Sequence, residues 1–174
     1  MVARRSEPYP PVAENAFLSK GHPPIAHVES DTRYVEAGPL LLGVEPRRLT
    51  TELIAANRRL HGNSPPDREF DDGGVTIHVF ESASKEELLR FDCFQRGPHY
   101  HYILPGGKDH LFVRFDEVAH GPMIDWVFRT LRSRLTTLLS QAGASTLGPE
   151  IDMQSFDKAL DKCEELARSA GKAA

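Results

Sequence analysis

The sequence has no long apolar run and no block of charges of one sign. No stretch approaches the roughly 20 apolar residues that a membrane-spanning helix requires. Arg4 and Arg5 near the start have no apolar segment behind them, which argues against a secretory signal. The net charge of −4 argues against a nucleic-acid partner, which selects a basic surface. These absences predict a cytoplasmic protein that binds neither a membrane nor a nucleic acid.

Cysteine is also scarce. The two cysteines, Cys93 and Cys163, lie far apart and form no CxxC pair, so nothing in the sequence requires a disulfide or an oxidising compartment. A chain of 174 residues has the length of one ordinary domain and can bury a core without disulfides or metals. We therefore expect a single domain over residues 1–174.

Regular periodicity is missing from residues 1–45, where prolines exclude a long helix. This segment is predicted to be an extended arm with one short strand near Thr32–Glu36. Its many apolar residues indicate that it packs on this chain or on a neighbouring one. Pro46 suits a first helical position, and an apolar stripe then predicts a helix over residues 46–62.

Four short segments of alternating character follow within residues 75–115, separated by turn-like connections. They predict an antiparallel sheet, because short connections join antiparallel neighbours. Pro122 and Asp152 then begin two helices with continuous apolar faces, within residues 122–171. The expected fold class is α+β: a four-stranded antiparallel meander packed on about three helices, with an extended proline-rich N-terminal arm.

Alternation along the predicted strands sorts their side chains onto two faces. One face is almost wholly apolar and is expected to pack on the helices. The other mixes apolar and polar side chains. Its polar residues include His78, Arg90, Asp92, His99 and His101. Loop lengths place His78 opposite Arg90 and Asp92 opposite His101. The apolar side chains on this mixed face indicate that the arm or a second subunit covers it.

His99 and His101 are two residues apart, so both point the same way from one strand. Asp92 could be a third ligand or could orient one of the rings. His78 or His110 could supply another ligand. The face that His110 occupies depends on the preceding loop, whose length the sequence leaves open by one residue. This set predicts a site for a divalent transition metal such as Fe, Zn, Mn or Cu.

The same residues also allow chemistry without a metal. Asp92 beside His101 would give an oriented imidazole for general acid/base catalysis, and Arg90 could hold a substrate carboxylate. The candidate catalytic residues are therefore Asp92, His101 and Arg90. The simpler alternative is the solvated face of an antiparallel sheet, on which histidines need no function.

Two short patterns, His99–His101 and Pro105–His110, resemble in their letters the metal-binding motifs of the cupin family. That family places several strand residues and a glutamate between its two motifs, whereas only Tyr102, Ile103 and Leu104 stand between them here. The predicted strands are also too few for a double-stranded barrel. The sequence therefore assigns no family.

The sequence thus predicts a small protein with a histidine-lined metal or small-molecule site on a sheet face. A metal-dependent enzyme, either an oxidoreductase or a hydrolase, would use such a site. The alternative is a non-catalytic accessory protein that uses this face and the arm to form a homodimer or to bind another protein. One enclosed pocket containing His78, Asp92, His99 and His101 would favour the enzyme. A flat face pressed on a partner would favour the alternative.

Overall fold

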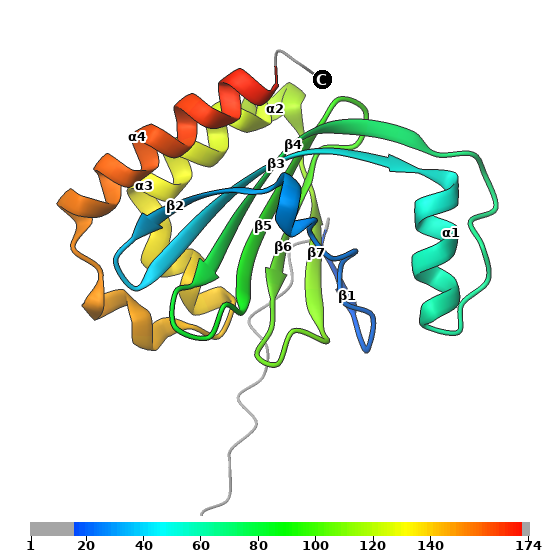
Figure 1. The fold of residues 1–174 in the computed structure, drawn as a ribbon, viewed down its shortest axis with the longest axis horizontal. Coiled ribbons are helices and arrows are strands. Elements are labelled where there is room, and N and C mark those ends of the chain that lie inside the picture. Colours follow the sequence, from blue (N-terminus) through cyan, green and yellow to red (C-terminus); the bar gives the residue numbers. More distant parts are fainter. Residues whose placement is uncertain (1–15, 172–174) are drawn as a thin grey trace, which may run out of the picture.

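Figure 1 shows the computed structural model, which describes residues 16–171. Within these residues, seven antiparallel strands form one sheet in the order β1-β7-β6-β5-β4-β3-β2. The strands are β1 (Ala16–Ser19), β2 (Arg33–Ala37), β3 (Leu40–Thr50), β4 (Asp71–Glu81), β5 (Glu87–Phe94), β6 (His99–Ile103) and β7 (His110–Arg114). The helices are α1 (Thr51–Leu60), α2 (Glu117–His120), α3 (Met123–Gln141) and α4 (Met153–Ala170), with short 3-10 helices η1 (Glu29–Asp31) and η2 (Ser145–Glu150).

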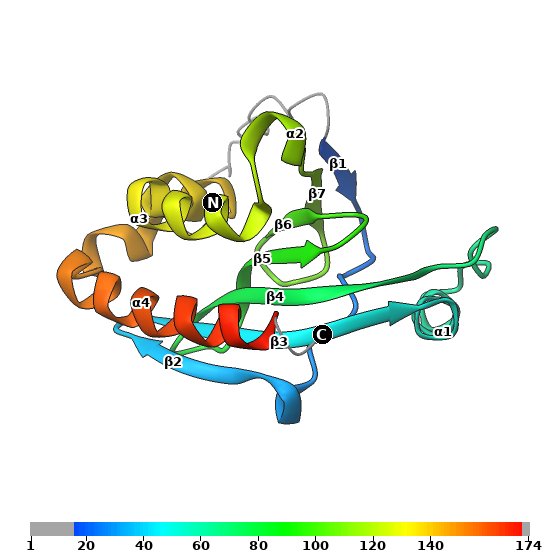
Figure 2. The same cartoon turned by 90° about the horizontal axis from the view of Figure 1, so that it is seen from above.

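Helices α3 and α4 cover one face of the sheet (Figures 1 and 2). Apolar side chains of the strands and the helices meet there to form the core. The largest fully buried ones include Leu40, Leu42, Ile77, Leu89 and Phe91 on the strands, and Phe128, Leu131, Leu139, Phe156 and Leu160 on the helices. Among residues 16–171, no helix is both long and apolar enough to cross a membrane.

The expected four-stranded meander on about three helices is wrong, because the meander is only part of a seven-stranded sheet. The additional strands come largely from the segment predicted as an extended arm, of which residues 1–15 lie outside the described part. Strands β2 and β3 form a hairpin that turns at Gly38 and Pro39, with Ala37 paired to Leu40. Proline at a turn leaves both ladders intact, so its presence did not exclude strands here.

The helix predicted over residues 46–62 begins too early. Pro46 lies in β3, paired with Val75 of β4. The pairing of β2 with β3 ends at Val44, so β3 has become an edge on that side, where a missing N–H costs no ladder hydrogen bond. Helix α1 begins only after Thr50, whose side chain accepts a hydrogen bond from the N–H of Leu53.

The chain itself covers the sheet face opposite α3 and α4. Residues 20–28, which we call the strap, connect β1 to η1 without regular secondary structure. Arg47 and Arg90 both donate hydrogen bonds to the carbonyl oxygen of Ile25 in the strap, at 2.8 and 2.6 Å. Part of the predicted arm therefore packs across the mixed face of its own sheet.

Candidate metal centre

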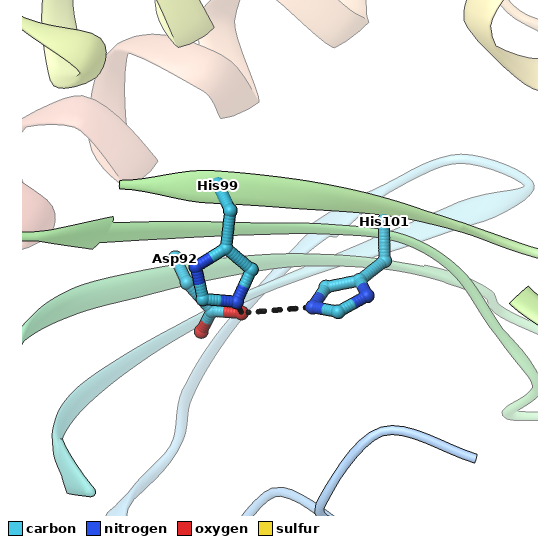
Figure 3. Close-up of side chains that lie close together, drawn as sticks. All are labelled: Asp92, His99 and His101. Carbon is cyan, nitrogen blue, oxygen red and sulfur yellow. Dashed lines mark ion pairs between the residues drawn. The ribbon is translucent and has the colours of Figure 1, made fainter. Parts of the chain in front are cut away.

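Asp92, His99 and His101 come together on two neighbouring strands in the middle of the sheet. Asp92 of β5 pairs directly with His99 of β6, and Arg90 pairs with His101. The predicted pairing of Asp92 with His101 is thus wrong by two residues, a shift that keeps every side chain on its face. Figure 3 shows the three side chains projecting from the sheet on the side away from the helices.

The spacing of the three side chains suits a single small cation. The Nε2 atom of His99 lies 3.2 Å from Oδ2 of Asp92, and Nε2 of His101 lies 3.3 Å from the same oxygen. One ligand atom from each residue can be chosen so that all lie within 4.8 Å of one another. Ligands of a tetrahedral zinc ion, at about 2.0–2.1 Å from the metal, are separated by about 3.3–3.4 Å. The two separations of 3.2 and 3.3 Å fit this edge length.

The backbone fixes which nitrogen of His99 carries a proton. Its Nδ1 atom lies 2.7 Å from the carbonyl oxygen of Gly97. A carbonyl can only accept, so Nδ1 is the donor, and Nε2 of the neutral ring has a lone pair. Stacking on Phe112, with ring centroids 4.5 Å apart, holds the ring in place. When the ring is neutral, the backbone carbonyl thus orients it as in a metal-binding histidine, with Nε2 available to a metal, and when the ring carries a second proton Nε2 donates to Asp92 instead.

Asp92 is a carboxylate whose two oxygens have different partners. Thr76 donates its hydroxyl to Oδ1 at 2.6 Å, which leaves Oδ2 to the two histidines. Burial alone would raise the pKa of Asp92, but hydrogen bonds with His101 and His99 hold that pKa well below its usual value. The group is therefore ionised at neutral pH and can serve as a metal ligand.

His110 lies beside this group. It begins β7, pairs with Ile103 and therefore shares a face with His101, which resolves the loop length that the sequence left open. The two imidazole centroids are 4.8 Å apart. Burial lowers the pKa of His101 to about 4 and that of His110 to about 3, so both rings are neutral at pH 7. The ligand group found among the described residues contains Asp92, His99 and His101 without His110.

His78, a predicted ligand, belongs to a separate cluster. Its Nδ1 atom lies 2.6 Å from Oε1 of Glu87, and its Nε2 atom lies 3.1 Å from Oε2 of Glu45. Burial alone would lower the pKa of His78, but hydrogen bonds to both glutamates outweigh it and raise the pKa above its usual value. His78 is thus an ion-pair partner of two carboxylates and is not in the ligand group formed by Asp92, His99 and His101.

Arg90, a predicted substrate-binding residue, also contacts this second cluster. Its Nε and Nη2 atoms donate to Glu87 at 2.8 and 2.5 Å, and its Nη1 atom donates to the carbonyl of Ile25. The structure directs these donors at the protein's own oxygens. Arg90 is His101's cross-strand neighbour, but these hydrogen bonds hold it against Glu87 and the strap.

Sequence reasoning missed the partners of this cluster, Glu45 and Glu87. Glu45 lies on the mixed face because Leu40, Leu42 and Val44 point into the core, an alternation that the assignment of Pro46 to a helix concealed. Glu87 reaches His78 because the register of β4 and β5 shifts between Val79 and Phe80. No local sequence pattern signals such a bulge.

Asp92, His99 and His101 do not line the cavity of about 1010 Å³ that the described residues enclose. This cavity lies between the C-terminal end of α4 and the projecting ribbon of β3 and β4. Its lining residues include Arg33, Arg48, Gly73, Arg96 and Leu166. The side chain of His99 is 13% exposed, compared with 6% for His101 and 4% for Asp92. His99 is therefore the most accessible of the three side chains.

No curated protein and no solved structure matches the chain. One family model does match, over residues 34–167, a segment that contains Asp92, His99 and His101 but not the strap. Because this match covers most of the chain, the protein belongs to the family described as Domain of unknown function (DUF7700).

Proposed function

We propose that this protein binds one divalent transition metal ion through Oδ2 of Asp92 and the Nε2 atoms of His99 and His101. The observation that carries the proposal is the bond from Nδ1 of His99 to the Gly97 carbonyl, which leaves Nε2 unprotonated in the neutral ring. In that form of the ring, two electron-rich atoms face each other at 3.2 Å, because a hydrogen bond from Nε2 to Asp92 needs a second proton on the imidazole. A cation bound between them converts this repulsion into attraction.

Two imidazoles and one carboxylate favour zinc or ferrous iron over magnesium or calcium, which prefer oxygen ligands. Three protein ligands also leave a coordination position for water or a small-molecule ligand, as in catalytic rather than structural zinc sites. A metal in such a position supplies Lewis acidity or, for iron, redox chemistry. The proposed activity is accordingly that of a metal-dependent hydrolase or oxidoreductase.

Elemental analysis of the tag-free protein, after incubation with zinc or ferrous iron and removal of excess metal, tests this proposal. We expect close to one metal ion per chain in the parent and almost none in Asp92→Asn, which keeps the size of the side chain and an acceptor for Thr76. Asp157→Asn, on the exposed side of α4, is the matched control and should bind like the parent. Equal metal content in the parent and Asp92→Asn would contradict the proposal.

A second candidate function is homodimer formation through β1. This strand is at the end of the described sheet and exposes two apolar side chains, Phe17 at 54% and Leu18 at 36%. Exposed apolar edges are common sites of strand addition between chains. Light scattering coupled to size-exclusion chromatography should give the mass of a dimer for the parent and of a monomer for Phe17→Lys. A parent of monomer mass at all concentrations would exclude this candidate.

A further inference from the structure

Two buried ring nitrogens next to the candidate metal centre have no hydrogen-bond partner among the described residues. They are Nδ1 of His101 and Nδ1 of His110. The two residues are 5% and 6% exposed, and their ring centroids lie 4.8 Å apart with an interplanar angle of 63°. Buried polar atoms in native proteins nearly always have partners, so this coincidence needs an explanation.

The protonation of His110 follows from its contact with the strap. His110 forms a hydrogen bond with the backbone of His22 that favours the protonated nitrogen, as a carbonyl acceptor does. Because Nδ1 of His110 has no partner, this bond involves Nε2. The neutral ring of His110 therefore carries its proton on Nε2, and its Nδ1 atom is an acceptor directed to the interior.

His101 needs the complementary arrangement when it binds a metal. A lone pair on Nε2 for the ion requires the proton to be on Nδ1, and metal-binding histidines almost always donate that proton to an oriented acceptor. His99 has such an acceptor in the Gly97 carbonyl. For His101, the candidate acceptor is Nδ1 of His110, the other unpartnered nitrogen, on a ring whose centroid lies 4.8 Å away.

We infer that His110 is a positioning residue, which holds His101 in the tautomer that binds the metal and is itself held by the backbone of His22 in the strap. This inference rests on the proposed metal site. It also couples the strap to that site, because a displaced strap would release His110 and thereby weaken the binding of the metal by His101. The strap then regulates metal affinity without contributing a ligand.

Zinc affinity, measured by competition with a chromophoric chelator, tests the inference in three variants. His110→Phe preserves ring volume but removes the acceptor, and we expect it to weaken zinc binding by about 10–100-fold. His110→Asn places an amide oxygen near the position of Nδ1 and should restore much of the affinity. His120→Asn, on the exposed helix α2, controls for the loss of a histidine and should bind like the parent.

Long-range ¹H–¹⁵N spectra of the zinc-loaded parent give a second readout that needs no variant. We expect the proton of His101 on Nδ1 and that of His110 on Nε2. A His110 ring protonated on Nδ1, or a Phe variant that binds zinc as tightly as the parent, would overturn the inference and leave the metal site standing. A parent that binds no zinc or iron would overturn the proposed function and this inference with it.

Discussion

At the residue scale, the face beneath the strap holds charged groups that compensate one another. Three carboxylates, those of Glu45, Glu87 and Asp92, are balanced by Arg47, Arg90 and the protonated ring of His78. Burying any one of these charges alone would cost several kcal/mol, whereas hydrogen-bonded pairs offset much of that cost. Removing a single partner should therefore destabilise the fold more than its contact area suggests.

Glu87 provides the clearest test of this balance, since it contacts both His78 and Arg90. The Arg90 charge and the His78 hydrogen bond outweigh burial and lower the pKa of Glu87 to about 2. We expect Glu87→Gln to lower the free energy of unfolding by about 3–5 kcal/mol, because Arg90 loses its paired carboxylate and His78 loses one of its two. Urea denaturation at pH 7 measures this, with the exposed neighbour Glu86→Gln as control. Equal losses in the two variants would argue against the balance.

His78 should give the stability a distinctive pH dependence. Its folded pKa lies above the ordinary value of 6.5, so its contribution is complete below that pH and is lost as the pH rises through the folded pKa. Glu87 acts in the opposite direction, contributing above 4.5 and losing its contribution as the pH falls toward 2. Urea unfolding between pH 6 and 9, at about half-unit steps, should show a decline in the parent that His78→Gln lacks. Parallel profiles for the two proteins would contradict this role of His78.

At the element scale, the two ends of the β3–β4 ribbon differ in what they stabilise. One end lies under α4, where Phe156, Leu160 and Cys163 are buried to 1% exposure or less. The other end projects and bears α1, which has no buried residue (Figure 2). Core stability should therefore depend on α4 and hardly on α1.

A pair of identical substitutions separates these roles. Leu160→Ala, at a fully buried site on α4, should cost about 2–5 kcal/mol of unfolding free energy because it leaves a cavity. Leu60→Ala, on α1 with 83% of the residue exposed, should change that free energy by less than about 0.5 kcal/mol. Thermal unfolding followed by circular dichroism compares them, and similar shifts for the two would show that α1 contributes to the core after all.

Deleting α1 altogether tests more stringently whether core stability depends on this helix. Thr50 and Asp71 are paired at the end of the ribbon, so a two-residue Asn-Gly turn can replace residues 51–70. A shorter loop costs less closure entropy, which offsets the loss of the packing of α1 on the ribbon. We expect a folded protein whose unfolding free energy lies within about 2 kcal/mol of the parent's. An unfolded product would show that α1 is needed for the ribbon.

The sequence predicted elements well where the signals were local and poorly where they depended on distant pairing. The apolar stripe after Pro122 and the cap at Asp152 mark α3 and α4, and both helices are present. Pro46 wrongly indicated the start of a helix. A proline fits in β3 at this position because the pairing of β2 with β3 has already ended at Val44. The register shift between Val79 and Phe80 likewise has no local sequence signal, and Leu88 beside it lies in the core.

At the scale of the whole molecule, the sheet lies between two unlike covers, the helices on one face and the strap on the other. Strict alternation was enough to predict that Asp92, His99 and His101 share a face, because a register error of two residues does not change the face. Their proximity to one another could therefore be predicted. The separation of His78 from this group could not, because it depends on the contacts of His78 with Glu45 of β3 and with Glu87 beside the bulge.

The most direct test of the metal site is a crystal structure of the zinc-loaded protein with an anomalous difference map calculated at the zinc edge. We predict one strong peak about 2.0–2.2 Å from Oδ2 of Asp92 and from the Nε2 atoms of His99 and His101. No peak at this position, with the two rings hydrogen-bonded to Asp92 in fully zinc-soaked crystals, would contradict the metal site. It would identify the three residues as a structural hydrogen-bond network.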